Sequence, residues 1–301
     1  VSYTLSAEIP MEEVAHSVAM KKKSTHYLIL FAVLLLAGVA VLLYPTVSNL
    51  IIRKRLNDEI DRYNRFTSGD GDLYYEQWAA AEEYNRYLAS KGNQFVLEDG
   101  EKERVEGLLD PLGNGMMGYI DIPKIGEHIP IYHGTEEKQL QSGAGYWYGS
   151  SLPTGGSGTH CIITAHSGLV KAKLFTDLDQ LEVGDRFILR VLDRVLEYEV
   201  NNISVTEPSD MSGLYISDGE DYVTLYTCTP YGINTQRLLV RGVRVVQSSD
   251  DAGGSADVDR TDVKKQTTLK IIILIAVFLA TVAAVIFMSV RYARQSRAKQ
   301  R

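Results

Sequence analysis

Two uncharged apolar segments bracket the middle of this chain and limit how it can fold. They are Tyr27–Tyr44 and Ile271–Val290, and we extend the second to residues 269–290. Each is close to the length of about 20 residues that a helix needs to cross a bilayer. We therefore predict transmembrane helices over 27–44 and 269–290. A signal peptide is the alternative for the first segment, although its apolar run is longer than a usual signal core.

The basic residues around these segments predict which side of the membrane the middle of the chain faces. Lys264 and Lys265 precede the second segment, whereas more basic residues follow it, namely Arg291, Arg294, Arg297, Lys299 and Arg301. Basic residues accumulate on the cytoplasmic side of a membrane. Around the first segment the pattern is mixed, because Lys21–Lys23 precede it and Arg53–Arg55 follow it. The second segment therefore predicts cytoplasmic tails at 1–26 and 291–301, and an extracytoplasmic middle of a multi-pass membrane protein.

The charge of the chain bears on whether it binds nucleic acid. The formal net charge is −7, and the middle of the chain has no stripe of lysine and arginine. A protein that binds the phosphate backbone of a nucleic acid normally carries a basic patch on its surface. We therefore expect no nucleic-acid partner.

The middle of the chain is dominated by short strand patterns. β-branched and aromatic residues recur between glycine and proline clusters, over residues 118–122, 129–132, 159–165, 186–191, 196–205, 221–227 and 236–246. The main helical pattern among them is a brief one at Lys173–Leu181. Many short strands with few helices predict a mainly β fold, a closed or nearly closed β-barrel.

The flanks of this barrel region have their own composition. Apolar residues recur at helical spacing between Leu50 and Leu88, which predicts an extracytoplasmic helical segment over 45–108. A polar stretch, Glu98–Glu106, separates that segment from the barrel domain, which we expect at 109–247. A linker rich in serine, aspartate and glycine follows at 248–268.

Cys228 is the candidate nucleophile. It ends an alternating strand pattern and precedes a turn, whereas Cys161 lies in an apolar run and is expected to be a buried core residue. A thiol becomes a strong nucleophile only when a nearby base or positive charge favours its thiolate. Because an extracytoplasmic compartment permits disulfides, a Cys161–Cys228 bridge is the structural alternative.

Two further residues are candidates for assisting a thiol. His166 follows the predicted strand 159–165 and begins a loop, where site residues often lie, although a plain surface histidine would fit the same pattern. Arg237 opens the strand after the turn Thr229–Thr235, so an antiparallel hairpin brings it beside Cys228. A guanidinium there can stabilise a thiolate or an oxyanion, and a surface salt bridge is its structural alternative. The other histidines in the middle of the chain, with weaker claims, are His128, His133 and His160.

These residues also carry a family resemblance. The segment Thr224-Leu225-Tyr226-Thr227-Cys228 resembles the TLxTC signature of sortases, with Thr224, Leu225 and Thr227 as its supporting positions. Its continuation to Gly242 resembles the class C branch, which assembles pili. Thr164–Gly168 matches the place of that family's catalytic histidine, and Gly118–Ile125 looks like its first barrel strand.

The resemblance implies a sortase-type barrel and a transpeptidase without metal or organic cofactor. Cys228 would attack the Thr carbonyl of an LPxTG-like motif, cleaving between Thr and Gly and forming a thioester. Arg237 would hold the developing oxyanion, and His166 would act as acid and then base. In a class C sortase the acceptor is a lysine amine of a pilin. The implied partners are pilins or surface proteins with C-terminal LPxTG-like motifs, in a Gram-positive type of cell envelope.

The resemblance also suggests a lid. Class C sortases usually carry an Asp-Pro-aromatic motif before the first barrel strand, and Asp110-Pro111-Leu112 occupies that place, with the lid near 110–113. Leu112 departs from the aromatic residue, so it cannot stack as a ring would. An ordinary Asp-Pro turn is the alternative.

Two other functions stay open. A housekeeping sortase would attach surface proteins to peptidoglycan instead of polymerising pilins. A non-catalytic barrel tethered to the membrane would bind a partner and leave Cys228 without a chemical role. The reactivity of Cys228 and the identity of the acceptor amine distinguish the three.

Replacing Cys161 with alanine is expected to leave turnover intact, because a thiol that only fills core space takes no part in the reaction. The measurement is the rate of product formation by Cys161→Ala beside that of the wild type. Loss of turnover in a variant that still folds would overturn this interpretation.

Overall fold

The computed structural model describes residues 11–68, 74–169 and 171–245, together with 276–278, 280–284, 287 and 291. The chain divides into two units, one of Val1–Pro45 with Asp259–Arg301 and one of Thr46–Val258. The predicted linker 248–268 lies outside the described residues. So do most of the predicted second span, Ile271–Val290, and all of the tail 291–301 except Arg291.

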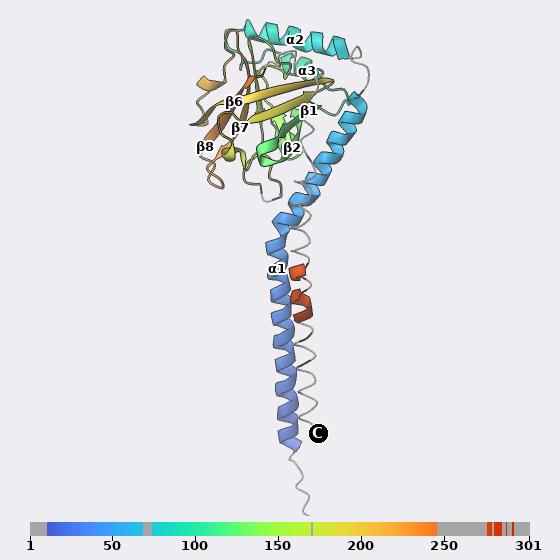
Figure 1. Ribbon diagram of the computed structural model, residues 1–301. Coiled ribbons are helices and arrows are strands. Elements are labelled where there is room, and N and C mark those ends of the chain that lie inside the picture. The colour runs from blue at the N-terminus through green and yellow to red at the C-terminus, as the bar shows by residue number, and fades with distance from the viewer. Residues whose placement is uncertain are drawn as a thin grey trace, which may run out of the picture. The chain divides into compact units, whose positions relative to one another are not determined.

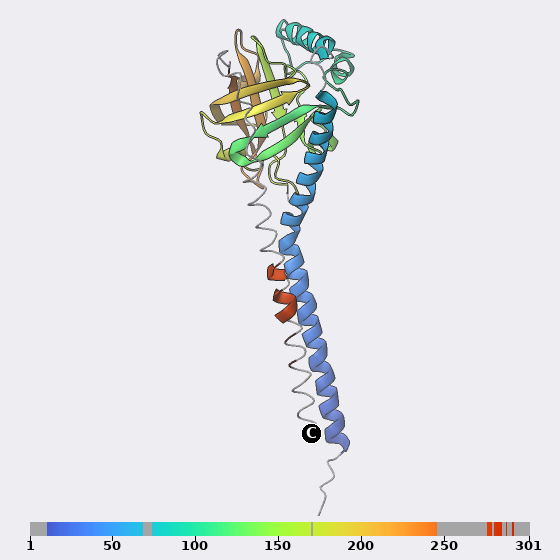
Figure 2. The ribbon, with the colours of Figure 1, turned by 45° about the vertical axis from the view of Figure 1, so that its right-hand side comes forward.

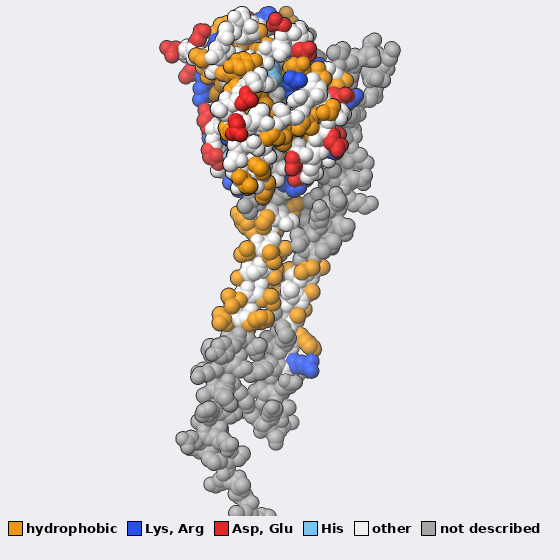
Figure 3. Space-filling view, turned by 90° about the vertical axis from the view of Figure 1, so that its left-hand side faces the viewer, with side chains coloured by type: hydrophobic (Ala, Val, Ile, Leu, Met, Phe, Trp, Pro, Cys, Tyr) orange, Lys and Arg blue, Asp and Glu red, His pale blue; other side chains and the backbone are white. Residues whose placement is uncertain are grey.

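The N-terminal part of the described chain is a long helix, α1 (Met11–Thr67). Among the described residues it is the one helix long and apolar enough to cross a membrane. Hydrophobic side chains such as Leu34 and Leu42 are exposed along it, and Figure 3 shows such side chains over the described helical stretches. This agrees with the predicted apolar helix at 27–44 and is consistent with a membrane anchor.

The second unit contains a closed barrel of eight strands in the order β1-β2-β3-β4-β7-β8-β6-β5 (Figure 1). The strands are β1 (Met116–Ile122), β2 (Glu127–His133), β3 (Ala144–Tyr146), β4 (Thr159–Thr164), β5 (Arg186–Val191), β6 (Arg194–Thr206), β7 (Asp221–Thr229) and β8 (Gln236–Arg244). Seven of them coincide with the predicted strand segments. The predicted mainly β fold with a closed barrel is confirmed.

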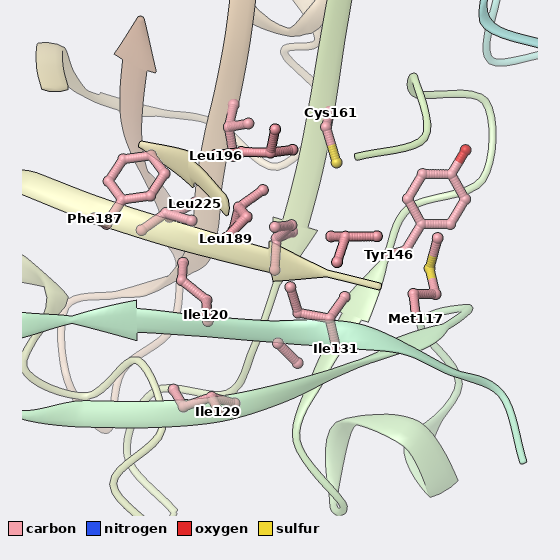
Figure 4. Packing of buried hydrophobic residues seen from close by; sticks show 14 of the residues in the cluster. Met117, Ile120, Ile129, Ile131, Tyr146, Cys161, Phe187, Leu189, Leu196 and Leu225 are labelled. Atoms are coloured by element: carbon pink, nitrogen blue, oxygen red, sulfur yellow. The ribbon is translucent and has the colours of Figure 1, made fainter. Parts of the chain in front are cut away.

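Alternation along the strands fills the barrel. Side chains that point inward pack into one large core, as Figure 4 shows for Ile120, Cys161, Phe187, Leu189 and Leu225. Because successive side chains of a strand point to opposite faces, the residues between them lie on the outer surface. Cys161 is buried in this core, as predicted, and both cysteines are free, so the disulfide alternative is wrong.

The eighth strand, β3, has no signal in the sequence. It is only three residues long and contains Gly145, where a Cβ atom would come within 2.3 Å of the Gly134 carbonyl oxygen. Glycine is therefore required by close backbone approach, and it weakens the strand pattern. β3 pairs in parallel with β2 and antiparallel with β4, so this short strand is needed for closure.

Short helices complete the second unit. They are α2 (Tyr75–Ala89), α3 (Glu101–Glu106), α4 (Glu137–Leu140), η2 (Pro123–Ile125), η3 (Leu178–Gln180) and η4 (Ser212–Leu214). The predicted helical segment is thus two helices, with residues 69–73 outside the described chain, and α3 lies inside the stretch expected as a polar separator. The apolar residues at helical spacing, including Trp78, Tyr84 and Leu88, form the buried face of α2.

The helix predicted at Lys173–Leu181 is wrong. The segment is a series of turns ending in η3, and Leu174 has a positive φ of 44°. Its backbone hydrogen bonds are not those of a helix: Phe175 N donates to the His166 carbonyl oxygen, nine residues earlier, at 3.1 Å. Leu174, Phe175 and Leu178 are buried in the barrel core. Their spacing resembles that of a helix, but here it lets a loop pack its apolar side chains inward.

The last turns of α1 run beside β1 and β2 (Figure 2). Near their start, Asn49 Oδ1 accepts a hydrogen bond of 3.1 Å from Lys173 N, and Arg53 pairs with the buried Glu127. Near their end, Tyr63 is fully buried, and its hydroxyl donates to the Met117 carbonyl and accepts from Leu192 N, both at 2.7 Å. These contacts fix the last turns of α1 along one side of the barrel.

Replacing Tyr63 with phenylalanine should destabilise the fold by about 2 kcal/mol, because it leaves two buried backbone groups without partners. The expected drop in Tm is roughly 5 °C, measured by thermal unfolding of the full chain in detergent. Tyr75→Phe is the control, since Tyr75 is 74% exposed. Equal Tm values for the two variants would contradict the proposed anchoring role.

Candidate active site

Cys228 and Arg237 face each other across two antiparallel strands. They form a register pair of β7 with β8, one step from the β7–β8 turn. Both side chains are partly exposed. They share the outer face of the barrel, because their neighbours Thr227 and Leu238 are buried on the inner side. The predicted hairpin therefore brings the thiol and the guanidinium to one place.

His166 reaches the same place from β4. β4 runs parallel to β7, and their last register pair is Thr164 with Tyr226. Ala165 continues the pairing, since its N–H donates to the Tyr226 carbonyl at 3.3 Å. Two residues beyond the last pair, His166 and Cys228 are level with each other. The sequence-predicted trio of Cys228, His166 and Arg237 is thus brought together by three adjacent strands.

The supporting residues of the Thr224–Cys228 segment each have a structural task. The Thr227 hydroxyl donates to the Ala165 carbonyl at 2.7 Å, which ties β7 to the residue before His166. The Thr224 hydroxyl lies 2.7 Å from His160 Nε2, and Leu225 is fully buried in the barrel core. The motif therefore fixes the register and spacing of β4 and β7 just below the site.

An apolar cluster covers the outer face next to Cys228. It consists of Ile162, Leu214, Tyr226 and Leu239, with Phe95, Trp147 and Met211 packed against it. Tyr226 lies two residues before Cys228 on the same face. Its ring packs edge to face against the Trp147 ring, with 5.1 Å between the ring centroids. Burial raises the pKa of the Tyr226 hydroxyl, and the nearby Arg237 guanidinium opposes that rise. We refer to this set as the outer apolar cluster.

The Arg237 side chain is held by its own hairpin. Its Nη1 donates to the carbonyl oxygens of Asn234 and Gln236, at 3.1 and 2.9 Å. The Tyr226 hydroxyl also takes a hydrogen bond from this guanidinium. The group is therefore oriented beside Cys228, and among the described residues no carboxylate forms an ion pair with it.

His166 is held by its backbone and faces an acid. Its carbonyl oxygen accepts the hydrogen bond from Phe175 N. Its Nε2 atom lies 3.5 Å from Oε2 of Glu137, at the start of α4, and its side chain is 27% exposed. Sequence reasoning missed Glu137, because a glutamate in a polar loop 29 residues before the histidine carries no spacing signal.

The other histidines of the domain are engaged elsewhere. His160 is buried, with Nδ1 3.0 Å from the Tyr215 carbonyl, and burial lowers its pKa to about 4. His133 is buried against the Leu108 carbonyl, and burial lowers its pKa as well. His128 pairs with Asp121, which also accepts a hydrogen bond from Arg190. None of these three lies on the outer face beside Cys228.

Asp110, Pro111 and Leu112 lie away from this trio. The Asp110 carboxylate accepts hydrogen bonds from Asn114 N and Gly115 N, and Leu112 packs against the cluster that contains Tyr63. Among the described contacts Asp110 has none with Arg237 or Cys228, so the expected contact is not made. The segment is an Asp-Pro turn leading into β1, and we do not assign it a lid role.

Comparison with known proteins gives a consistent match. The family model described as Sortase domain matches residues 120–245. The crystal structure of sortase C1 from Streptococcus agalactiae is 42% identical, with a TM-score of 0.60, and the match covers 65% of this chain and 100% of that one. Sortase C from Streptococcus pneumoniae is 43% identical, with a TM-score of 0.57, over 63% and 97% of the two chains.

A curated relative matches over a shorter region. Sortase A of Bacillus anthracis is 30% identical over 127 residues, which are 42% of this chain and 59% of that protein. The match therefore spans less than two thirds of the length of this relative.

Acidification should destabilise the fold through His160. Its folded-state pKa of about 4 lies below the usual unfolded value of about 6.5, so the unfolded chain binds the proton more readily. The neutral ring therefore stabilises the fold above about pH 6.5, and up to about 3 kcal/mol of this is lost as the pH falls to 4.

The check is the free energy of unfolding of the full chain in detergent at pH 7 and pH 4.5. His160→Gln should lose less stability on acidification than the wild type, because glutamine does not titrate. Equal losses in the two proteins would refute the assignment.

Proposed function

Because the chain belongs to the sortase family, we propose that it is a cysteine transpeptidase with Cys228 as nucleophile. The observation that carries the proposal is the register pair of Cys228 with Arg237, with His166 level with them at the end of β4. A nucleophile, an acid–base group and a fixed cation on one open face are the parts that acyl transfer needs. The similar solved structures are class C sortases, which supports the same chemistry.

The proposed reaction has two steps. The Cys228 thiolate attacks the Thr carbonyl carbon of an LPxTG-like motif, and the C–N bond to Gly breaks. His166 donates a proton to the leaving Gly amine, and a thioester remains on Cys228. An acceptor amine then attacks the thioester, His166 takes a proton from it, and the thiolate is released as the new amide bond forms.

Arg237 would stabilise the negative charge that develops on the carbonyl oxygen. Its guanidinium is oriented by carbonyl oxygens of the β7–β8 hairpin and has no carboxylate partner among the described contacts. A preorganised cation at such an oxygen is a large contributor to catalysis. It also stands beside the thiol, where positive charge favours the thiolate.

The outer apolar cluster would receive the apolar part of the sorting motif. Tyr226 lies two residues before Cys228 and Leu239 two residues after Arg237, on the same face, and both are nearly buried. An extended peptide whose Thr carbonyl is at Cys228 would pass over them and meet the partly exposed Phe95, Trp147 and Met211. Apolar side chains flanked by a few polar groups are typical of peptide and ligand sites.

We further propose that the acceptor is a lysine amine of a pilin. The support is similarity to class C enzymes, including a Streptococcus pneumoniae sortase C whose structure was related to pilin substrate specificity. Attachment of surface proteins to peptidoglycan is the competing function, and the acceptor amine distinguishes the two.

The proposed setting is the outer face of a Gram-positive type of membrane. α1 supports one anchor. The second span at 269–290, the cytoplasmic tails and the domain boundaries at 45–108, 109–247 and 248–268 stay proposals drawn from the sequence. Two spans would return the C-terminus to the cytoplasm and leave the barrel outside.

The test is a ligation assay with the full chain in detergent, an LPxTG-containing peptide and a lysine-containing pilin fragment, read by mass spectrometry. Wild type should form a thioester on Cys228 and then an isopeptide product, and Cys228→Ala should form neither. Arg237→Ala should lower kcat by about 100-fold, the usual scale for losing an oxyanion donor.

Cys161→Ala is the matched control and should behave as wild type, since this thiol is buried in the barrel core. A thioester without ligation to the pilin, but with transfer to a peptidoglycan-type amine, would favour the housekeeping function. If wild type forms no thioester, the transpeptidase proposal fails. The alternative of a non-catalytic barrel that binds a partner is then favoured.

A further inference from the structure

We propose that Glu137 is a positioning residue for His166: its carboxylate orients the imidazole ring and stabilises the positive charge that the ring carries during proton transfer. The inference rests on the proposed function, because it assigns a partner to the acid–base residue of that reaction. Glu137 touches neither the thiol nor the guanidinium in any described contact, so its effect would pass through His166.

The environment of the ring nitrogen carries the argument. His166 Nε2 is shielded from solvent and has no hydrogen-bond partner among the described residues. The acidic oxygen that approaches it is Glu137 Oε2, at 3.5 Å, within ion-pair range. An unpartnered polar atom away from water is costly. A hydrogen on Nε2 points at this carboxylate, so the contact orients the ring and selects the tautomer with Nε2 protonated. The carboxylate then also stabilises the positive charge that the ring gains when it takes a second proton on Nδ1.

Glu137 is itself held in place. Gln141, one helical turn later, donates from Nε2 to Glu137 Oε1 at 2.6 Å. Lys171 Nζ donates to Gln141 Oε1 at 3.3 Å, which links α4 to the loop after His166. The hydrogen bond from Gln141, with help from nearby His166, holds the pKa of Glu137 below its usual range. The carboxylate is therefore ionised at neutral pH.

Other charged and titratable groups surround this pair. Cys228 and Arg237 face it from β7 and β8, and Lys171 faces it from the loop beyond His166. The Tyr231 ring, on the β7–β8 hairpin, lies close to Gly168, since a Cβ atom added at Gly168 would be 3.4 Å from the ring. Arg237 and Lys171 disfavour a second cation nearby, whereas a Cys228 thiolate favours it. Glu137 supplies the fixed negative charge that offsets the two basic side chains.

The proposed chemistry makes this charge useful. His166 must carry a proton when the Gly amine departs, and a cationic ring beside Cys228 also favours the thiolate. Removing the carboxylate should therefore lower turnover without weakening substrate binding. On the scale of partly exposed ion pairs, the expected loss of kcat is on the order of fivefold.

The experiment uses the full chain in detergent with Cys161→Ala as background, so that Cys228 is the single thiol. Glu137→Gln removes the charge at constant size, and Glu137→Asp restores it at a shorter reach. Glu136→Gln is the matched control, because Glu136 is the neighbouring glutamate and pairs instead with Lys102 at 2.8 Å. Two readouts are taken between pH 5 and 9: kcat and KM for ligation, and the rate of Cys228 alkylation by iodoacetamide.

Glu137→Gln should lower kcat about fivefold with KM unchanged and move the basic limb of the pH profile to lower pH. Its Cys228 alkylation at neutral pH should fall several-fold. Glu137→Asp should recover part of both losses, and Glu136→Gln should match the background protein.

An unchanged pH profile and kcat in Glu137→Gln would overturn the inference and leave the sortase proposal standing. A fall in Tm with an unchanged pH profile would assign Glu137 a structural role and overturn it equally. If the background protein forms no ligation product, the proposed function fails instead. The alkylation profile, which needs no substrate, then still decides whether Glu137 acts on the thiol through His166.

Discussion

The pairing of β7 with β4 on one side and β8 on the other is the constraint on which the candidate site depends. β7 carries Cys228, and its parallel register with β4 sets the level at which His166 leaves the sheet. Its antiparallel register with β8 sets Arg237 directly opposite the thiol. A slip of one residue in either pairing would turn a side chain to the other face of the sheet. The Thr227 hydroxyl, bonded to the Ala165 carbonyl, helps to prevent that slip.

Barrel closure gives this three-strand platform its rigidity. Each strand of the closed barrel has a neighbour on both sides, so there is no free sheet edge near the site. The inward-facing side chains pack into one large core that supports these strands. The last turns of α1 add a brace along β1 and β2 through Arg53 and Tyr63. The turns at 171–181 pack into the same core and hold the His166 backbone through Phe175. The proposed catalytic trio on this fixed surface would need little reorganisation when a peptide binds.

Burial distinguishes His160, near the start of β4, from His166, two residues beyond its end. His160 is enclosed by Thr224 and Tyr215, and its pKa is lowered to about 4 because a charged ring there would lose its hydration. His166 lies at the opposite end of the strand, partly exposed and beside Glu137. One ring is therefore kept neutral as a structural hydrogen-bonding group, and the other stays partly exposed beside the proposed nucleophile. This division follows from where the strand begins and ends.

The sequence by itself determined most of the strands, the buried role of Cys161 and the identity of Cys228, His166 and Arg237 as candidates. Strand alternation and turn residues are local, and the Thr224–Cys228 segment joins its structural and chemical parts within five residues. Only the tertiary structure decided the rest, because it depends on contacts between residues distant in the chain. It revealed the short strand β3, whose glycines hide it in the sequence. It also showed that the apolar residues at 173–181 pack as a loop, and that Asp110 bonds to Asn114 and Gly115 in a turn before β1. It also brought Glu137 to His166, since α4 and the end of β4 meet only when the barrel closes.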